Sequence, residues 1–424
     1  MTNDNKDAAP RSGMSIGYLV PEFPAQTHIF YWREIDALKQ EGVTCELIST
    51  RRPPNNISSH SWSQVAASQT FYLYPASILD LVWAGVRIAK SGAFAWFRCC
   101  QSLLRARVPL KAKLRLVALA LLSGKLIRHC EMNRIHHIHV TSCADGANVA
   151  MFASLFSNLT YSLTHLGPSL STYGPNQPEK WRYAKFAIVE SEMLLNMAKK
   201  QIAQYMPTML AVSSMGVDLD RVNRKREYIP WCGTGTVRIF SCGRLNPVKG
   251  YIDLLDAIRM LKVNHFDVEL AIAGEDEQGG AGYRQNLEAY IKKCDLQDCV
   301  RLLGAVSEEE VIEHLEDSHI FALASLNEGT SIAIMEALAM GVPMVVTRVG
   351  NTPQMVVHRQ DAMLVHANRP IDLFHALRDI LSDSKFASSL SKHARLAAER
   401  QFSHRTSARL LAGYIRQLDG KMSH

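Results

Sequence analysis

Residues 320–336 read IFALASLNEGTSIAIME, an apolar run followed by a polar turn and then a segment with helical spacing. Short apolar runs bounded by turn residues are typical of buried strands. A strand that leads through a polar loop into a helix places backbone N–H groups at the carboxyl edge of a sheet, where α/β proteins bind ligands. Glu328 is expected on the loop and Glu336 inside the helix. Two carboxylates at such an edge suggest either an acid–base couple, as in glycosidases, or groups that bind hydroxyls.

The chain of 424 residues is too long for one hydrophobic core, and we expect two domains. Its 47% hydrophobic and 21% charged residues, without low-complexity tracts, are typical of a globular protein. Residues 1–13 form a polar segment, expected to be a flexible tail, without the apolar core of a secretory signal. The nine cysteines are odd in number, and none of them forms a C-x-x-C pair. This pattern favours a reduced, cytoplasmic compartment and argues against a structural zinc site.

Residues 14–215 alternate between strand and helix signals, which predicts a doubly wound parallel sheet. A helical pattern at 31–38 separates the first two strand signals. The turn-rich segment 216–235 is the expected linker. The strands expected in this first domain are 16–20, 45–49, 70–74, 135–140, 161–165 and 186–189.

A second series of alternating strand and helix signals occupies residues 236–398. One of its helices begins at a capping box formed by Ser307 and Glu310. A last stretch, 371–418, is mostly helical with a break at 382–384, and residues 399–424 are expected to form a helix that crosses back to the first domain. The other expected elements are strands 237–242, 268–273, 300–303, 320–324 and 343–347 and helices 252–261 and 283–294.

A basic and apolar helical stretch, at about residues 85–134, is inserted into the first domain, and its only acidic residue is Glu131. Such a stretch favours either an anionic membrane surface or an anionic substrate. It is equally consistent with surface helices whose apolar faces pack on the sheet. The longest uncharged run, 116–124, is far shorter than the roughly 20 residues that span a bilayer. No nucleic-acid-binding motif accompanies the charge, so nucleic acid is not an expected partner.

Residues 243–250, GRLNPVKG, lie between an expected strand and an expected helix. The glycines permit a tight turn, and Arg244 and Lys249 flank the place where a diphosphate would bind helix N-terminal amides. Taken alone, this segment is better explained as an ordinary strand-to-helix turn with surface charges. Residues 328–336 are expected at the same edge of the same sheet, and the two segments together indicate a diphosphate leaving group. Glu328 and Glu336 are therefore interpreted as groups that bind hydroxyls of the donor, and not as the acid and base of a hydrolase.

Residues 243–250 and 328–343 resemble the nucleotide-sugar half of family-4 glycosyltransferases, also described as glycosyl transferases group 1, which have the GT-B fold of two Rossmann-like domains facing a cleft. The resemblance implies that Arg244 and Lys249 neutralise the donor diphosphate, that Glu336 binds the ribose hydroxyls and that Glu328 faces the donor sugar. Negative charge develops on the leaving diphosphate in the transition state. Cations and backbone amides that already face this diphosphate would therefore accelerate the reaction. The further donor-binding residues that it implies are Gly243, Gly274, Gly329, Thr330 and Ser331.

The resemblance extends more loosely to the first domain. His165, in 164–167, resembles the cleft histidine that contacts the donor sugar and is counted with Arg244, Lys249 and Glu328 among the expected catalytic residues. Related polysaccharide-building members often have Ser-Glu-Thr-Phe at the first strand-to-helix loop, where this chain has residues 27–30, THIF. In the second domain, similar sequences commonly have Gly-Gly and a Glu after the proline, where this chain has Asn351 and Gln354. The residues expected on the acceptor side are Phe23, Thr27, His28 and Asn176.

Two further groups suggest a metal site but are interpreted otherwise. His136, His137 and His139 lack a nearby carboxylate or cysteine partner and fit a structural cluster at the end of a strand. Asp218 and Asp220 match the Asp-x-Asp pattern of metal-dependent glycosyltransferases but fall in the expected linker. We therefore expect neither a metal nor a cofactor.

The sequence predicts an α/β, GT-B protein that acts as a retaining, metal-independent glycosyltransferase. Its donor would be a UDP-, GDP- or ADP-sugar and its acceptor a hydroxyl, expected on a lipid-linked oligosaccharide used for exopolysaccharide or cell-surface polysaccharide, at the inner face of an anionic membrane. Two alternatives stay open. One is a non-catalytic GT-B scaffold that binds a partner transferase or the membrane, and the other is a sugar-nucleotide epimerase.

Overall fold

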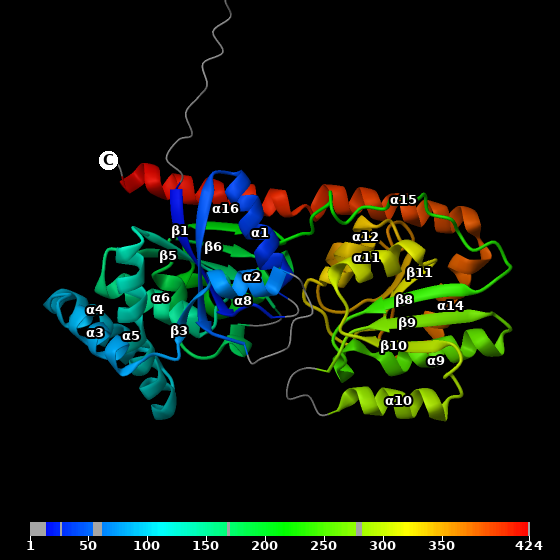
Figure 1. Cartoon of the computed structure of the whole chain (residues 1–424), viewed down its shortest axis with the longest axis horizontal. Coiled ribbons are helices and arrows are strands. Elements are labelled where there is room, and N and C mark those ends of the chain that lie inside the picture. The colour runs from blue at the N-terminus through cyan, green and yellow to red at the C-terminus, as the bar shows by residue number, and fades with distance from the viewer. Residues whose placement is uncertain (1–13, 26–27, 54–61, 168–169, 277–281, 423–424) are drawn as a thin grey trace, which may run out of the picture.

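The computed structural model describes residues 14–25, 28–53, 62–167, 170–276 and 282–422. They form two α/β domains, the N-terminal one at the left of Figure 1 and the C-terminal one at the right. Within these described ranges each domain is built on one parallel sheet, with seven strands in the first domain and six in the second. Thr27 lies outside the described residues.

The N-terminal sheet has the strand order β3-β2-β1-β4-β5-β6-β7. The order changes direction between β1 and β4, and in such sheets ligands bind where the loops diverge at this switch point. The loop that follows β1 therefore faces a ligand-binding edge. The strands are β1 (Met14–Glu22), β2 (Val43–Arg51), β3 (Phe71–Tyr74), β4 (His137–Val140), β5 (Thr160–His165), β6 (Phe186–Val189) and β7 (Met209–Val212).

Alternation along β1 divides the N-terminal core between the two faces of the sheet, because successive side chains point to opposite faces. Ile16 and Tyr18 pack with α1 (Ile29–Gln40), α2 (Trp62–Gln69) and α16 (His404–Met422). Leu19 packs with the helices of the other face. These are α3 (Ile78–Ala89), α4 (Ala93–Arg105), α5 (Leu110–Met132), α6 (Asp145–Phe156), α7 (Gln177–Arg182) and α8 (Glu192–Ile202), and the short helices η1 (Leu170–Tyr173) and η2 (Ala203–Tyr205) belong to the same domain.

The C-terminal sheet has the order β10-β9-β8-β11-β12-β13, with its own switch point between β8 and β11. One face packs on α9, α10 and α14, and the other face packs on α11, α12 and part of α15. The strands are β8 (Val237–Cys242), β9 (Val268–Ala273), β10 (Val300–Gly304), β11 (Ile320–Leu323), β12 (Met344–Thr347) and β13 (Met363–Val365). The helices are η3 (Pro247–Lys249), α9 (Tyr251–Val263), α10 (Tyr283–Lys293), α11 (Glu308–Asp317), α12 (Ile332–Ala339), α13 (Thr352–Met355), α14 (Pro370–Ser382) and α15 (Ser384–Gln401).

Two segments connect the domains and run beside each other. The N–H of Val217 donates to the carbonyl oxygen of Phe402 at 2.8 Å, and the N–H of His404 donates to the carbonyl oxygen of Val217 at 3.1 Å. After this point α16, red in Figure 1, lies against α1 of the N-terminal domain, and the Nε of Arg409 binds Glu41 at 3.0 Å. Helix α16 thus follows the C-terminal domain in the sequence but packs on the N-terminal domain.

The doubly wound α/β fold predicted from the sequence is confirmed. The capping box at Ser307 is present, because its side chain accepts from the N–H of Glu310, which binds back to the N–H of Ser307. The prediction missed the short strands β7 and β13, and it missed a second break between α15 and α16 at 402–403. β13 has only three residues, which are too few to show a usable alternation.

Candidate functional site

Lys249 and Glu328 form an ion pair where the loops after β8 and β11 meet. Lys249 ends η3, and its Nζ binds the Glu328 carboxylate, which also accepts a hydrogen bond from the Ser325 hydroxyl at 3.0 Å. The side chains are 15% and 10% exposed. Gly250 allows the close approach of these loops, because a Cβ there would lie 2.0 Å from the Ala324 carbonyl oxygen. Two residues predicted for the site are therefore brought together.

The loop that carries Glu328 is held by the segment after β12. The N–H of Asn351 donates to the carbonyl oxygen of Glu328 at 3.1 Å, and its side-chain amide donates to the Thr330 hydroxyl, also at 3.1 Å. Gly350 has a φ of 50°, and a Cβ there would lie 1.7 Å from the same Glu328 oxygen. Asn351, noted as a departure from related sequences, thus braces the loop. Ser331 follows as the N-cap of α12.

Glu336 lies within α12, but its partner is a residue of the other domain. The Nη2 of Arg33, in α1, lies 3.3 Å from the Oε1 of Glu336 and also binds Glu308 at the start of α11. The side chains of Arg33, Glu336 and Glu308 are 5%, 10% and 5% exposed. Burial raises the pKa of Glu336, although the charge of Arg33 works in the opposite direction.

His28 faces the C-terminal domain from the start of α1. Burial lowers the pKa of His28 to about 4, and the positive charge of Arg244 contributes to the lowering. The imidazole stacks on Phe23, with ring centroids 6.4 Å apart. Arg244 itself is exposed. Because a charge acts on a titrating group only at short range, the Arg244 loop and the loop after β1 face each other across the domain boundary.

His165 and Gly167 line the N-terminal side of the same boundary. Burial lowers the pKa of His165 to about 4, and its Nδ1 has no hydrogen-bond partner within the described residues. A Cβ on Gly329 would lie 3.9 Å from the Cα of Gly167, so backbones of the two domains nearly touch here. The imidazole is 1% exposed, so in this structure its Nδ1 is enclosed by protein atoms.

Glu190, at the end of β6, was not predicted from the sequence. The backbone N–H of Gly167 and the hydroxyl of Thr330, which belongs to the other domain, act to lower the pKa of this carboxyl. Burial nevertheless raises the pKa of Glu190 to about 8. Its position directly after a buried strand is the signal that marks carboxyl-edge residues in α/β sheets. Arg33 had no comparable signal, because a charged residue inside an amphipathic helix is ordinary.

Several predicted residues serve packing in this structure. Phe23 was expected on the acceptor side, but its side chain is fully buried and packs with Trp62. Asn176 is 6% exposed and donates to the Asn148 side chain at 3.2 Å. Gly274 is required by the fold, since a Cβ there would lie 1.9 Å from the carbonyl oxygen of Gly243. These are the contacts of Phe23 and Asn176 within the protein, and their place on the acceptor side stays a prediction.

The two histidines of β4, His137 and His139, contact hydroxyl groups of the neighbouring strand β5. His137 contacts the hydroxyls of Thr160 and Ser162 at 2.8 and 2.9 Å, and His139 contacts those of Ser162 and Thr164 at the same distances. Burial lowers the pKa of both imidazoles to about 3. Among the described residues, no cluster of His, Cys, Asp and Glu is arranged to hold a metal ion.

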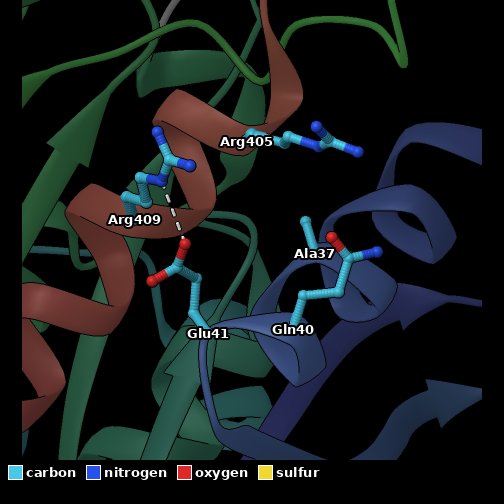
Figure 2. Close-up of a pocket in the computed structure, with 5 residues that line it drawn as sticks. All are labelled: Ala37, Gln40, Glu41, Arg405 and Arg409. Atoms are coloured by element: carbon cyan, nitrogen blue, oxygen red, sulfur yellow. Dashed lines mark hydrogen bonds and ion pairs between the residues drawn. The ribbon is translucent and has the colours of Figure 1, made fainter. Parts of the chain in front are cut away.

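Asp218 and Asp220, the second candidate for metal binding, bind the protein instead. Asp218 accepts from the N–H groups of Asp220 and Arg221 at 3.0 and 3.3 Å, and Asp220 pairs with Arg405. Figure 2 shows a pocket of about 270 Å³ nearby, between α1 and α16, lined by Gln40, Glu41 and two arginines of α16. These arginines are held by Asp220 and Glu41, so their charges are already balanced.

Comparison with known proteins identifies the second domain. Residues 233–397 match the family Glycosyl transferases group 1. The amylovoran biosynthesis glycosyltransferase AmsK of Erwinia amylovora is 28% identical over 241 residues, which are 54% of this chain and 57% of AmsK. WcaL of Escherichia coli (strain K12), named as a colanic acid biosynthesis glycosyltransferase, is 30% identical over 217 residues, 49% of this chain and 51% of WcaL. The chain thus spans about half the length of these curated relatives.

The fold has counterparts among solved structures. HepE of Anabaena, in complex with UDP, superposes with a TM-score of 0.70 at 15% identity, over 95% of this chain and 100% of that chain. The protein therefore has the GT-B fold, with two Rossmann-like domains facing each other. The match of residues 233–397 to that family confirms the glycosyl transferases group 1 part of the resemblance inferred from residues 243–250 and 328–343, and the assignment to family 4 stays a prediction.

Proposed function

We propose that this protein is a retaining glycosyltransferase that moves a hexosyl group from a nucleoside-diphosphate sugar to a hydroxyl of a lipid-linked oligosaccharide. The observation that carries this proposal is the ion pair of Lys249 and Glu328, which joins the two expected donor-binding loops inside a glycosyl transferases group 1 domain. AmsK and WcaL are named for exopolysaccharides, amylovoran and colanic acid, and HepE binds UDP. These relatives support the substrate class and the polysaccharide product.

The donor would extend along the loops after β8 and β11. Arg244 and Lys249 would face the diphosphate, and the amides at the start of α12 would add hydrogen bonds to it or to the sugar. Lys249 holds Glu328, which would accept hydrogen bonds from the sugar hydroxyls. Glu336 would accept from the ribose hydroxyls.

In the proposed reaction the bond between the anomeric carbon and the diphosphate oxygen breaks while the acceptor oxygen bonds to the same face of the sugar. The acceptor proton passes to an oxygen of the leaving diphosphate. Arg244 and Lys249 offset the negative charge that develops on this leaving group, a function that some other transferases assign to a metal ion. Since these side chains and the helix amides can supply that charge, we propose that transfer proceeds without an added metal.

The acceptor would be presented by a membrane that the N-terminal domain touches. Helices α3, α4 and α5, at the far left of Figure 1, carry a surface that we call the α3–α5 face. Among the described residues, no helix is long and apolar enough to cross a bilayer. The face mixes exposed apolar side chains of Ile78, Leu79, Val82, Trp83, Phe94, Phe97, Leu104, Leu110, Leu114 and Val117 with exposed cations of Lys90, Arg105, Arg107, Lys111, Arg115 and Arg128.

The α3–α5 face has the composition of surfaces that lie in the headgroup region of anionic bilayers. Apolar rings enter the boundary of the acyl chains, while Lys and Arg remain with the lipid phosphates. We therefore propose peripheral attachment to the inner face of the cytoplasmic membrane. This attachment would bring the N-terminal domain to the membrane that carries the lipid-linked acceptor.

The function can be tested with purified protein, a panel of UDP-, GDP- and ADP-sugars and a lipid extract. The expected result is a lipid product heavier by one hexosyl unit, formed equally well in the presence of a metal chelator. Conversion of the donor in the absence of lipid would instead indicate an epimerase. In thermal unfolding, a nucleoside diphosphate at about 100 times its Kd should stabilise the protein by about 2.7 kcal/mol. No stabilisation by any nucleotide would favour a non-catalytic scaffold.

A further inference from the structure

Arg33 is a buried cation of the N-terminal domain whose partners are carboxylates of the C-terminal domain. Its Nη2 contacts both Glu308 and Glu336, at separations of 275 and 303 residues along the chain. Its side chain is 5% exposed, and its Nε and Nη1 have no hydrogen-bond partner within the described residues. Among the described residues, Glu308 and Glu336 are its only ion-pair partners, so the burial of this guanidinium is balanced by these two carboxylates.

The helix that carries Arg33 explains how the residue reaches the other domain. In α1, the side chains of Tyr31 and Leu38 pack into the core shared with α16. Glu34, the next residue, remains within this domain, where it accepts from the hydroxyls of Tyr18 and Ser407. Because adjacent positions of a helix point in directions about 100° apart, Arg33 is turned away from this cluster and toward α11 and α12.

The charges around Glu336 come from three elements of the structure. Arg33 of α1 lies on one side and favours the ionised carboxylate, whereas Glu308 of α11 and burial disfavour it. Cys242, at the end of β8, is also within electrostatic range of Glu336 and is a neutral thiol, because burial raises the pKa of Cys242 to about 12. Arg221 pairs with Glu308, with Nη1 and Oε2 3.4 Å apart. Arg33 is therefore the cation that acts directly on Glu336.

We propose that Arg33 is a positioning residue for the nucleotide ribose, which it serves by holding and aiming the carboxylate of Glu336 from the opposite domain. This inference rests on the proposed function, in which Glu336 accepts hydrogen bonds from the two ribose hydroxyls. An ionised carboxylate can accept from both hydroxyls, whereas a protonated carboxyl uses one oxygen as a donor. Because the counter-ion belongs to α1, the ribose site is complete only when the two domains are apposed as in this structure.

The inference predicts opposite effects for the two partners of this cluster. In Arg33→Met, Glu336 loses its counter-ion, so protonation of Glu336 extends to higher pH and ribose recognition is lost there. In Glu308→Gln, Glu336 loses a neighbouring negative charge, so protonation is confined to lower pH. A purely structural role for the cluster would weaken the protein in both variants without moving the pH dependence in opposite directions.

The test compares a nucleoside diphosphate that binds the wild-type protein with its dideoxyribose counterpart, by calorimetry from acidic to mildly alkaline pH. The ratio of the two affinities isolates the ribose hydroxyls, because titration of the nucleotide phosphates is common to both ligands. In wild type, hydrogen bonds to a charged group should make this ratio about ten to a hundred. We expect it to fall toward one in Arg33→Met, with little change in affinity for the dideoxyribose nucleotide, and to be largely restored in Arg33→Lys.

Four results would overturn the inference. One is an affinity ratio in Arg33→Met that equals the wild-type ratio at every pH. Another is an equal loss of affinity for both nucleotides, which would assign Arg33 to the fold in general. If Arg33→Met does not fold, Glu308→Gln still tests the inference. In that variant, the pH at which the affinity ratio is halfway between its acidic and alkaline values should be lower than in wild type. A midpoint that is unchanged or raised contradicts the inference. Failure of the wild-type protein to bind any nucleotide would overturn the proposed function together with the inference.

Discussion

The Nζ of Lys249 binds the carboxylate of Glu328, which lies 79 residues further along the chain. The ion pair thus joins the loops that follow β8 and β11 at the carboxyl edge of the C-terminal sheet. The pair is mostly buried, and a buried charge that loses its partner is costly to the protein. In the proposed reaction the same ammonium would face the diphosphate. Lys249 would therefore both orient Glu328 and offset the charge of the leaving group.

Replacing Lys249 by Met should lower both nucleotide affinity and the rate of transfer. A hydrogen bond to a charged group contributes about 1.5–3 kcal/mol, which corresponds to roughly ten- to hundredfold in the affinity for the nucleoside diphosphate. The control is Lys262→Met, because Lys262 forms an exposed ion pair with Asp298 at 2.7 Å away from the site. Equal nucleotide affinity in the Lys249 and Lys262 variants, measured by calorimetry, would contradict the assignment of Lys249.

Gly350→Ala should disturb the loop of Glu328 although neither residue changes in charge. A Cβ at Gly350 would lie 1.7 Å from the Glu328 carbonyl oxygen, and the φ of 50° is unfavourable for alanine. We expect a destabilisation of more than about 1 kcal/mol together with weaker donor binding. Gly413→Ala, in α16 with no atom within 4 Å of the added methyl group, should instead stabilise by about 0.5–1 kcal/mol. Denaturant unfolding of both variants tests this contrast.

The sequence was sufficient to predict the fold because both domains repeat the same local signals. Buried strands such as Val268–Ala273 are continuous apolar runs, and helix starts such as Ser307 carry capping residues. The short strand Met363–Val365 was missed, because three residues show no usable periodicity.

The site was predictable only in part, for a physical reason. The loops at 243–250 and 328–336 could be placed at one sheet edge, since parallel strands end at the same edge. The pairing of Arg33 with Glu336 depends on how two domains approach each other, and no local pattern in the sequence contains that information. For the same reason the buried position of Phe23 could not be derived from its loop alone.

Glu190 should make stability fall as the pH rises. Its pKa in the folded protein is raised to about 8 from the ordinary glutamate value of 4.5, so the folded state retains a proton that the unfolded state has lost. Between these two pH values the wild-type protein should lose stability relative to Glu190→Gln, by at most about 1.4 kcal/mol for each pH unit. Above about pH 8 the difference should remain constant.

Thermal unfolding of wild type and Glu190→Gln at a series of pH values measures this effect. Glutamine has nearly the shape of glutamate and keeps a side-chain oxygen that can accept hydrogen bonds, but it does not titrate. A stability difference that does not vary between pH 4.5 and about pH 8 would show that Glu190 is ionised throughout that range.

The α3–α5 face should bind vesicles of anionic lipid through Phe94 and Phe97 of α4. Their side chains are 73% and 61% exposed, and burying such a ring contributes about 1.5–3 kcal/mol. Replacing both by Glu removes this term and adds charges that anionic headgroups repel, so sedimentation with the vesicles should fall more than about tenfold. The matched control is Ile371→Glu, which places a charge at a 40% exposed apolar position of α14 in the other domain.

Binding to the α3–α5 face should also depend on salt, because its cations act at the surface of the bilayer and are screened within about 8–10 Å at physiological ionic strength. Wild type and Ile371→Glu should lose vesicle binding together as salt is added, and neither should bind zwitterionic vesicles strongly. Nucleotide affinity should be the same in the Phe94→Glu and Phe97→Glu double variant as in wild type, since the proposed donor site lies in the other domain. Loss of nucleotide binding in that variant would mean that the substitutions disturb the fold, whereas unchanged vesicle binding would refute α4 as the contact surface.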